Sequence, residues 1–259
     1  MNSIIIGQFL VKWNGMERYI ICGVRIDNVT MDEALSRAEK MILTGGAHAV
    51  FSANPEIVLT ALRDTRFKEL LNTGDLVLPD GIGVVRVGRI LGMPFRERVA
   101  GVDFMEALCA RAAAHGWPVF FLGGRNSVAE RTSAYMQRAF PALRIAGWSE
   151  DMRAEAIGDS IHRAEIIFVA LGAPKQEAWI RDAMQKLRSV KCMVAVGGAF
   201  DMIAGDIPRA PAVARAWGLE WLWRLCMEPV RRWRRIMSAV IVFPIYAIAC
   251  HMKRKEIIQ

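Results

Sequence analysis

The sequence lacks the short motifs that mark several classes of nucleotide-dependent and metal-dependent enzymes. Neither the dinucleotide motif G-x-G-x-x-G nor the phosphate-binding loop G-x-x-x-x-G-K-[ST] occurs in its 259 residues. It has no Asp-x-Asp pair to hold a divalent cation on a diphosphate, and no Gly-x-Ser-x-Gly elbow of a serine hydrolase. These absences argue against a standard dinucleotide enzyme, a P-loop enzyme and a triad hydrolase. We therefore expect neither a metal nor another cofactor.

Cysteine is scarce, and the chain has no visible segment for export. The five cysteines have no C-x-x-C spacing, and the four histidines are dispersed, which favours reduced thiols in a cytoplasmic protein over a disulfide framework or a zinc site. The apolar run Ile4–Ile6 is too short for a signal peptide and no basic region precedes it. No repeat, low-complexity tract or Pro/Ser-rich linker is present. We expect one large domain, residues 1–217, followed by an appendage, residues 218–259.

Charge and hydropathy narrow the choice of partner. The net charge is +8 and 53% of the residues are hydrophobic, while the mean hydropathy of +0.23 is short of that of a multi-span membrane protein. A basic chain favours nucleic acid, anionic lipid or phosphate-bearing substrates as partners. The position of the basic residues decides among these, and they are concentrated at the C-terminus.

Short apolar runs alternate with amphipathic stretches along most of the chain. Strands are expected at 18–26 (interrupted at Gly23), His48–Ser52, Leu76–Leu78, Val119–Leu122, Arg144–Ala146, Ile166–Leu171 and Met193–Val196. Helices are expected from Thr30 to Gly45, from Asn54 to Leu62, and at Ile82–Leu91, Val102–His115, Val128–Phe140, Met152–Arg163 and Gln176–Arg188. This alternation predicts an α/β fold with a mostly parallel sheet and helices on both faces.

An acidic turn follows the strand at Leu76–Leu78. The stretch Leu78-Pro-Asp-Gly-Ile-Gly-Val-Val85 joins this strand to a helix, and such turns place reactive groups at the carboxyl edge of a parallel sheet. Asp80 can therefore face a pocket and accept a proton. The alternative is that Asp80 only caps the helix after it, and this stretch alone does not separate the two.

Three glycine-containing turns follow other expected strands, where backbone N–H groups can approach an anionic ligand. They contain Gly123 and Gly124, then Gly172 and Pro174, and finally the segment Gly197–Asp201. Together with Asp80 and the segment Ser52–Asn54, they favour a nucleotide-sized site.

Polar residues near these turns allow two interpretations each. Gln176 and Glu177 can hydrogen-bond a base or ribose, or can simply suit the first turn of a helix. Asp201 can hold ribose hydroxyls or act as a cap, and Arg98 can meet a phosphate or form a surface ion pair.

The C-terminal segment differs in composition from the rest of the chain. Tryptophans and arginines alternate from Trp217 to Arg235, and an apolar run, Ile236–Cys250, follows. With fifteen residues the run is short for a membrane span, which needs about 20. A basic stretch beside an apolar one is typical of docking at an anionic bilayer. Nucleic acid would leave the apolar run without a role, whereas a core helix with a solvated basic flank remains an alternative.

Several spaced motifs together resemble the WecG/TagA/CpsF family of bacterial glycosyltransferases, over about Tyr19 to Arg235. They are Ser52-Ala-Asn-Pro-Glu-Ile-Val58, the acidic turn, Arg98-Val-Ala-Gly-Val-Asp103, Gly172-Ala-Pro-Lys-Gln-Glu177, Gly197-Gly-Ala-Phe-Asp201, Arg209-Ala-Pro211 and Gly218-Leu-Glu-Trp221. The resemblance implies a Rossmann-like sheet with a C-terminal membrane-docking appendage. It also implies inverting, metal-independent transfer of a hexose-type sugar from a UDP-sugar to a polyprenyl-diphosphate-linked sugar. The enzyme would then be peripheral, at the cytoplasmic face of the inner membrane, and would serve exopolysaccharide or other cell-envelope glycan synthesis.

The resemblance also implies roles for individual residues. Asp80 matches the general base, and Asn54 and Arg98 match catalytic-site residues, as does Ser52, where the family often has threonine. Gln176 and Asp201 match nucleotide contacts. Arg224, Arg231 and Arg234 match appendage arginines near the acceptor diphosphate.

The sequence leaves other points open. N-acetylmannosamine, its uronic acid and glucose all remain candidates for the transferred sugar, and a homo-oligomer is possible. The alternative function is a membrane-associated nucleotide-binding protein without transferase activity, in which Asp80 is only a cap.

Overall fold

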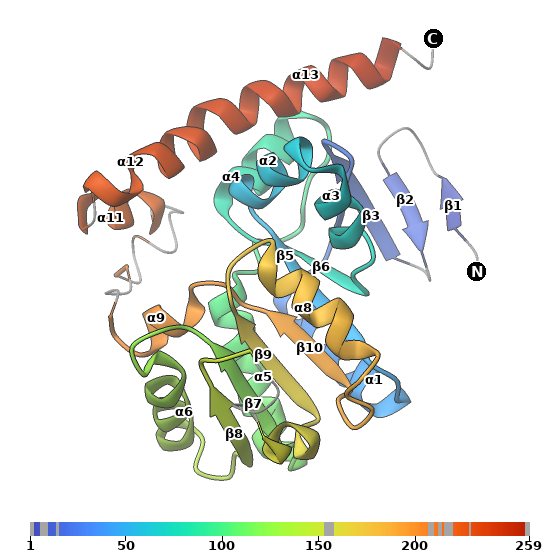
Figure 1. The fold of residues 1–259 in the computed structure, drawn as a ribbon. Helices are drawn as coiled ribbons and strands as arrows, with labels where there is room; N and C mark the ends of the chain where they lie inside the picture. Colours follow the sequence, from blue (N-terminus) through green and yellow to red (C-terminus); the bar gives the residue numbers. More distant parts are fainter. Residues whose placement is uncertain are drawn as a thin grey trace.

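The computed structural model describes residues 3–5, 10–13, 16–152, 158–206, 210–211, 214, 220–227 and 229–256. Within these ranges the chain forms a six-stranded sheet covered by helices, a smaller four-stranded sheet, and a long C-terminal helical segment that lies across one end (Figure 1).

The large sheet is parallel throughout. Its strands are β5 (His48–Ala53), β6 (Leu76–Pro79), β7 (Val119–Gly123), β8 (Ile145–Ser149), β9 (Ile166–Ala170) and β10 (Cys192–Ala195). They lie in the order β6-β5-β10-β9-β7-β8, with every neighbouring pair parallel. The predicted α/β fold with a parallel sheet is confirmed, and all strands end at the same edge of the sheet.

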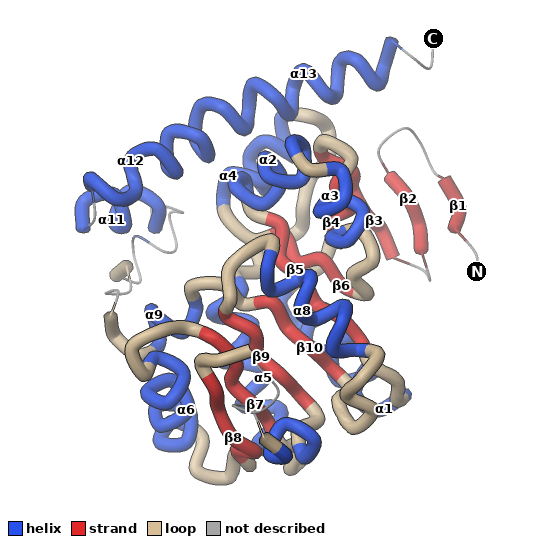
Figure 2. The backbone as a smooth tube through the Cα atoms, viewed as in Figure 1, coloured by secondary structure: helices blue, strands red, loops and turns tan. Residues whose placement is uncertain are grey.

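Buried side chains alternate between the two faces of this sheet, as strand geometry requires. Phe51 and Val77 pack into one hydrophobic core, whereas their neighbours Val50 and Leu76 pack into the other. The first core contains residues of α2 (Pro55–Arg63), α3 (Thr65–Leu71), α4 (Ile82–Ile90) and α8 (Lys175–Met184). The second contains residues of α1 (Met31–Thr44), α5 (Gly101–His115), α6 (Val128–Ala139) and α9 (Ala199–Ile203). Figure 2 shows helices in front of the sheet and behind it.

Local capping explains where several helices begin. Thr30 and Glu33 form the predicted capping box of α1, and Asn54 Oδ1 accepts a hydrogen bond from Ile57 N at 3.0 Å at the start of α2. Asp64 caps α3, a helix that the sequence analysis missed. The expected helix Met152–Arg163 is wrong in its described part, where only a 3₁₀ turn, η1 (Asp159–Arg163), forms; residues 153–157 lie outside the described residues. The expected helix Gln176–Arg188 already ends at Met184.

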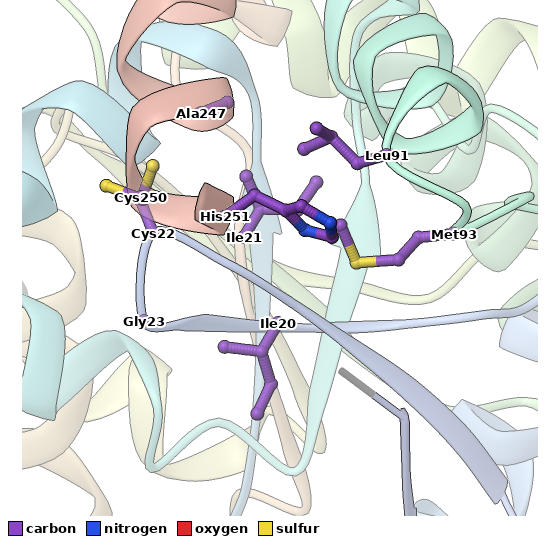
Figure 3. Close-up of a pocket in the computed structure, with 9 residues that line it drawn as sticks. All are labelled: Ile20, Ile21, Cys22, Gly23, Leu91, Met93, Ala247, Cys250 and His251. Atoms are coloured by element: carbon purple, nitrogen blue, oxygen red, sulfur yellow. The ribbon is translucent and has the colours of Figure 1, made fainter. Parts of the chain in front are cut away.

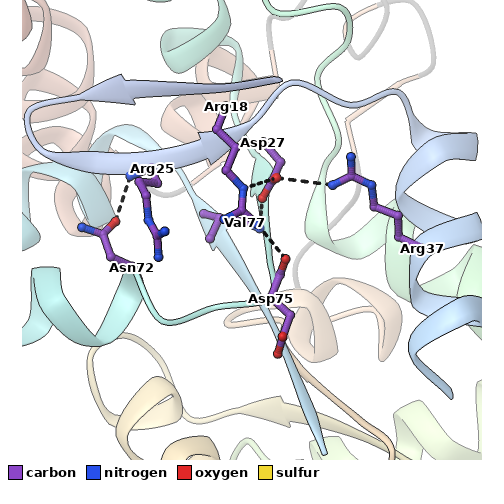
Figure 4. Close-up of polar contacts among 7 residues, drawn as sticks. All are labelled: Arg18, Arg25, Asp27, Arg37, Asn72, Asp75 and Val77. Atoms are coloured by element: carbon purple, nitrogen blue, oxygen red, sulfur yellow. Dashed lines mark hydrogen bonds and ion pairs between the residues drawn. The ribbon is translucent and has the colours of Figure 1, made fainter. Parts of the chain in front are cut away.

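The small sheet covers the outer edge of the large one. Its antiparallel strands are β1 (Ser3–Ile5), β2 (Leu10–Trp13), β3 (Met16–Ile21) and β4 (Val24–Asp27). Asp27 is 1% exposed, and it accepts hydrogen bonds from Arg18 Nε at 2.7 Å and from the backbone N of Val77 on β6 at 2.8 Å (Figure 4). Arg18 also donates to the carbonyl of Asp75 at 2.9 Å. These bonds satisfy polar backbone groups that an edge strand otherwise exposes.

The C-terminal segment consists of several helices. They are α11 (Glu220–Met227), α12 (Pro229–Met237), a π-helical turn η2 (Ser238–Val242) and α13 (Phe243–Glu256). In η2 the backbone N–H of Phe243 donates to Ser238 O, and this wider turn directly precedes Pro244, which has no N–H to donate. α12, η2 and α13 therefore form one long helical segment. The predicted common face of Arg224, Arg231 and Arg234 needs a helix continuous through Pro229. Residue 228, between α11 and α12, lies outside the described residues, so this face stays a prediction.

Candidate active site

Register brings the predicted site segments to one edge of the large sheet. Ser52 is paired with Leu78, and Ala53 with Pro79, at the ends of β5 and β6. On the other side of β5, β10 runs in parallel and continues into the turn at Gly197. Ligands of open α/β sheets bind outside the carboxyl ends of the strands. The candidate site therefore lies where β5, β6 and β10 end.

Asp80 lies at this edge, and the helix that follows it begins one residue later. Its backbone N donates to Ala53 O at 3.1 Å, which fixes the turn after β6 to the end of β5. The N-cap residue of α4 is Gly81, with φ +87°. Asp80 is therefore not the N-cap residue of α4, and its role as a general base stays a prediction. Its half-buried carboxylate lies beside Ser52 and the start of α5, because a Cβ built on Gly101 would be 3.4 Å from Ser52 Oγ and 4.0 Å from Asp80 Oδ2.

The other predicted catalytic-site residues lie on segments that meet Asp80. Ser52 is buried near the end of β5, and Asn54 follows β5, with its Oδ1 used as the cap of α2. Arg98 is half-buried and precedes Val99, whose backbone N donates to Pro79 O at 3.0 Å. That bond holds the segment before α5 against the acidic turn, so Arg98 lies at the same edge of the sheet.

The glycines in the turns after β7 and β9, which were predicted to bind nucleotide, are required for different structural reasons. Gly123 has φ +106°, and a Cβ built on it would be 2.7 Å from Ala170 O. A Cβ built on Gly124 would be 2.2 Å from Val128 Cγ1. Both glycines are required by close packing of β7 against β9 and α6. Gly172, with φ +74°, has no neighbouring atom within 4 Å of a Cβ, so its turn is open on that side. Pro174 follows it as the N-cap of α8.

Gln176 and Glu177 connect two of these turns. Gln176 Oε1 accepts a hydrogen bond from Gly197 N at 3.0 Å, and its Nε2 donates to Glu177 Oε1 at 2.9 Å. Gln176 is 2% exposed and Glu177 is 0% exposed. The buried pair thus joins the turn after β9 to the turn after β10. Contact of either side chain with a nucleotide stays a prediction.

Burial has a consequence for the titration of Glu177. Desolvation raises the pKa of this carboxyl, and the hydrogen bond from Gln176 only partly opposes the shift. The folded state therefore keeps a proton at pH values where the unfolded chain has lost it, so this group's contribution to stability falls as pH rises through that window.

This titration predicts the pH dependence of a variant's stability. Glu177→Gln keeps the shape and an acceptor for Gln176 but cannot ionise. The melting temperature of the variant minus that of the wild type should be smallest near pH 4 and should increase toward pH 8. Thermal unfolding across this range measures it. A difference that stays constant or shrinks with rising pH would show that Glu177 is not held protonated by burial.

Asp201 lies on α9, just beyond the turn after β10. It is half-buried, and a Cβ on Gly198 would be 3.7 Å from its Oδ2. Asp201 is separated from Asp80 by the ends of β10 and β5, so the two carboxylates border different parts of the same edge. Within the ranges that the structure describes, no three His, Cys, Asp or Glu side chains gather into a possible metal site.

The C-terminal helical segment reaches this edge through contacts that the sequence did not predict. Arg235 Nε donates to Glu56 Oε2 at 3.0 Å, and Glu56 is two residues after Asn54. A Cβ on Gly83 would be 3.9 Å from Ala239 O, so η2 passes over the first turn of α4. The segment therefore lies beside the N-terminal ends of the two helices that follow Asn54 and Asp80.

Of the three predicted acceptor arginines, only Arg234 has a described side chain. It is exposed, and its Cζ lies 5.5 Å from the ring centroid of Trp233. The side chains of Arg224 on α11 and Arg231 on α12 lie outside the described part.

The long helical segment has one packed face and one exposed apolar face. Ile236, Phe243 and Ala247 are buried against the domain. The outward-facing apolar residues at helical spacing form what we call the outer stripe: Trp233, Met237, Val240, Ile241, Ile245, Ile248 and Met252. The core-helix alternative is therefore true of one face only.

This segment is also longer than the sequence analysis expected. Trp233–Lys253, with 21 residues, is long and apolar enough to cross a membrane, and an 18-residue stretch within it has a mean hydropathy of 1.7. The expectation of a segment too short to span is thus wrong by length alone. One such helix is weak evidence for a span, and here its inner face packs against the domain.

A small cavity lies between this segment and the β3–β4 hairpin. Its volume is about 60 Å³, and Cys22, Met93, Ala247, Cys250 and His251 are among its lining residues (Figure 3). Ligand pockets for small molecules are typically several times larger, roughly 300–1,000 Å³. Burial, together with the neighbouring Cys250 thiol, raises the pKa of the Cys22 thiol. The cavity is therefore an imperfection in helix packing and is distinct from the edge that carries Asp80.

The six-stranded parallel sheet with helices on both faces places the chain in the α/β class, whose ligands bind outside the carboxyl ends of the strands. The model of the Glycosyl transferase WecG/TagA/CpsF family matches residues 19–257. The chain belongs to this family, and it is a glycosyltransferase of the hexosyltransferase class. The resemblance seen in the sequence motifs is confirmed.

Named relatives share most of their length with this chain. It is 37% identical over 193 residues to the N-acetylglucosaminyldiphosphoundecaprenol N-acetyl-beta-D-mannosaminyltransferase of Bacillus spizizenii, which covers 73% of this chain and 74% of that protein. It is 32% identical over 244 residues to the enzyme of the same name from Staphylococcus aureus, covering 91% and 93%. A third, from Bacillus subtilis, is 30% identical over 246 residues, covering 93% and 94%.

Proposed function

We propose that this enzyme transfers a hexose-type sugar from a UDP-sugar to a polyprenyl-diphosphate-linked sugar. The relatives' names give N-acetylmannosamine as the sugar and an N-acetylglucosaminyl-diphospho-prenol as the acceptor, and we propose the same pair here. The observation that carries the proposal is the position of Asp80, whose carboxylate borders Ser52 and the start of α5 at the carboxyl edge of the sheet.

In the proposed reaction Asp80 is the general base. Its carboxylate takes the proton from the acceptor's sugar hydroxyl as that oxygen attacks the anomeric carbon, and UDP leaves from the opposite side. General-base catalysis of this kind contributes about 10²–10⁴-fold to a rate. Ser52 and Asn54, on the neighbouring strand end, orient sugar hydroxyls, and Arg98 approaches the same edge from the segment before α5.

The leaving UDP develops negative charge that the protein must stabilise. Fixed hydrogen-bond donors and cations usually contribute most to such stabilisation. The open turn at Gly172 and the backbone N–H of Gly198 supply hydrogen-bond donors, since the N–H of Gly197 is already bonded to Gln176, and Asp201 binds the ribose hydroxyls. Arg224, Arg231 and Arg234 serve the acceptor diphosphate, since the contact between Arg235 and Glu56 keeps α12 close to Asn54.

The lipid-linked acceptor requires a membrane surface. We propose that residues 218–259 act as an appendage that lies on the anionic cytoplasmic face of the inner membrane, with the outer stripe among the lipids and the basic residues near the headgroups. The packed inner face, with Phe243 and Ala247 buried, supports a helix lying in the interface rather than one crossing the bilayer.

The identity of the donor is tested with a panel of UDP-sugars. UDP-N-acetylmannosamine, its uronic acid form and UDP-glucose are each incubated with a synthetic N-acetylglucosaminyl-diphospho-prenol, and the lipid product is identified by mass spectrometry. We expect N-acetylmannosamine to be transferred at the highest kcat/KM. Preference for another sugar would leave the reaction class intact but correct the donor.

Metal independence gives a separate prediction. Because the chain has no Asp-x-Asp pair, charge on the diphosphate must be met by arginines and backbone N–H groups. Turnover should persist in excess EDTA, measured as UDP release with and without chelator. Loss of turnover that Mg²⁺ or Mn²⁺ restores would contradict the mechanism and direct attention to Asp103, Glu177 and Asp201 as ligands.

A further inference from the structure

Two of the described glycines lack the usual structural reasons for glycine. Most of the others have φ between +53° and +106°, which side-chain-bearing residues rarely adopt. Four more have an ordinary φ but a crowded position. A Cβ would come within 2.7 Å of another atom at Gly74 and Gly83, 2.6 Å at Gly88 and 3.0 Å at Gly147. Gly101 and Gly198 are the two in the described part of the chain that meet neither condition.

The neighbours of these two glycines are the candidate site's own polar groups. At Gly101, the first residue of α5, a Cβ would meet only Ser52 Oγ at 3.4 Å and Asp80 Oδ2 at 4.0 Å. At Gly198, which has φ −79°, it would meet only Asp201 Oδ2 at 3.7 Å. All three distances are ordinary van der Waals contacts, so the protein itself has room for a methyl group at both places. Packing within the protein therefore gives no reason for glycine at either position.

We infer that Gly101 and Gly198 are spacer glycines that determine which ligands fit at two subsites of the proposed glycosyltransferase. Gly101 leaves room beside Asp80 for the acceptor sugar's attacking hydroxyl, and Gly198 leaves room beside Asp201 for the hydroxyls of the donor's ribose. This inference rests on the proposed function, because it assigns the two carboxylates to acceptor and nucleotide.

Alanine substitutions test the two spacers separately. In Gly101→Ala the methyl group displaces the acceptor hydroxyl from Asp80, so kcat with the lipid-linked acceptor should fall at least about tenfold, since misplacement of reacting groups by 1 Å costs up to about 10²-fold. The Kd for UDP should stay within about twofold of the wild-type value. In Gly198→Ala the Kd for UDP should rise about tenfold, as overpacking of a filled site predicts.

Stability separates this role from a structural one. Alanine at a position where its backbone fits reduces the freedom of the unfolded chain, so both variants should melt at or above the wild-type temperature. Gly147→Ala on β8 is the matched control, because its Cβ would be 3.0 Å from Phe120 Cε2 and 3.1 Å from Ser160 Oγ of η1. It should melt lower, with wild-type UDP affinity and kcat per folded molecule.

Each outcome decides the inference. Lower kcat for Gly101→Ala and weaker UDP binding for Gly198→Ala, without loss of melting temperature, support it. Wild-type constants in both variants overturn it, and so does a loss of melting temperature as large as that of Gly147→Ala, which would make the two glycines packing residues. If the wild type itself shows no transfer, the proposed function fails and the spacer assignment fails with it. Transfer by the wild type with unaffected alanine variants removes the spacers alone.

Discussion

Asp80→Asn should abolish most of the transfer while leaving the fold and UDP binding nearly unchanged. The amide has almost the same shape as the carboxylate but cannot accept the acceptor's proton. We expect kcat to fall about 10²–10⁴-fold, with the Kd for UDP and the melting temperature close to those of the wild type. Helix stability is not at risk, because Gly81 rather than Asp80 is the N-cap residue of α4 and asparagine caps a helix about as well as aspartate.

Asp64→Asn is the matched control for that substitution. Asp64 is exposed and caps α3 through Phe67 N at 3.1 Å, and asparagine caps a helix about as well as aspartate. Its kcat should equal that of the wild type. An Asp80→Asn enzyme that retains more than about a tenth of wild-type kcat would rule out a general base worth 10²-fold or more.

Polar substitution of the outer stripe should remove the protein from anionic membranes. The triple change Ile241→Gln, Ile245→Gln and Ile248→Gln affects side chains that are 46%, 61% and 41% exposed and leaves the packed residues Phe243 and Ala247 in place. Burying an isoleucine side chain is worth about 1.5–3 kcal/mol, so three should shift vesicle binding by at least about 10²-fold. Flotation with phosphatidylglycerol vesicles, together with transfer to the lipid-linked acceptor, measures the effect.

The control must be an exposed apolar residue away from this helix. Leu43 on α1 is 71% exposed, and changing it to glutamine should leave flotation and transfer unchanged. UDP binding should be the same in the outer-stripe variant and in its control, because neither changes the turns after β9 and β10. If the outer-stripe variant floats and transfers as well as the wild type, lipid contact by this face is wrong. Truncation after Gly218 is a less specific test, since it also exposes the core that Phe243 covers.

Much of the scaffold could be predicted because it depends on local patterns. Apolar runs such as His48–Ser52 and the capping residues Thr30 and Asn54 fixed elements that the structure confirms. Parallel strands all end at one edge, so the acidic turn and the glycine turns had to meet there. The structure was needed to show that Gly81 rather than Asp80 is the N-cap residue of α4.

Other features depend on contacts between distant parts of the chain, and periodicity does not report these. Asp27 and Val77 are joined across 50 residues, and Arg235 and Glu56 across 179. The hydrogen bond from Gly197 N to the amide oxygen of Gln176 likewise joins two turns that lie 21 residues apart in the sequence. The outer stripe, too, is defined only once Phe243 and Ala247 are known to face the domain.

The most direct test of the whole account is acceptor-dependent UDP release by the purified wild-type protein. UDP-N-acetylmannosamine and N-acetylglucosaminyl-diphospho-prenol are supplied in phosphatidylglycerol vesicles, and UDP is quantified with either substrate omitted. The account predicts UDP release only when both substrates are present, in equal amount to a new lipid-linked disaccharide. UDP-sugar binding without any transfer, across the panel of donors, would contradict it and would favour a membrane-associated nucleotide-binding protein.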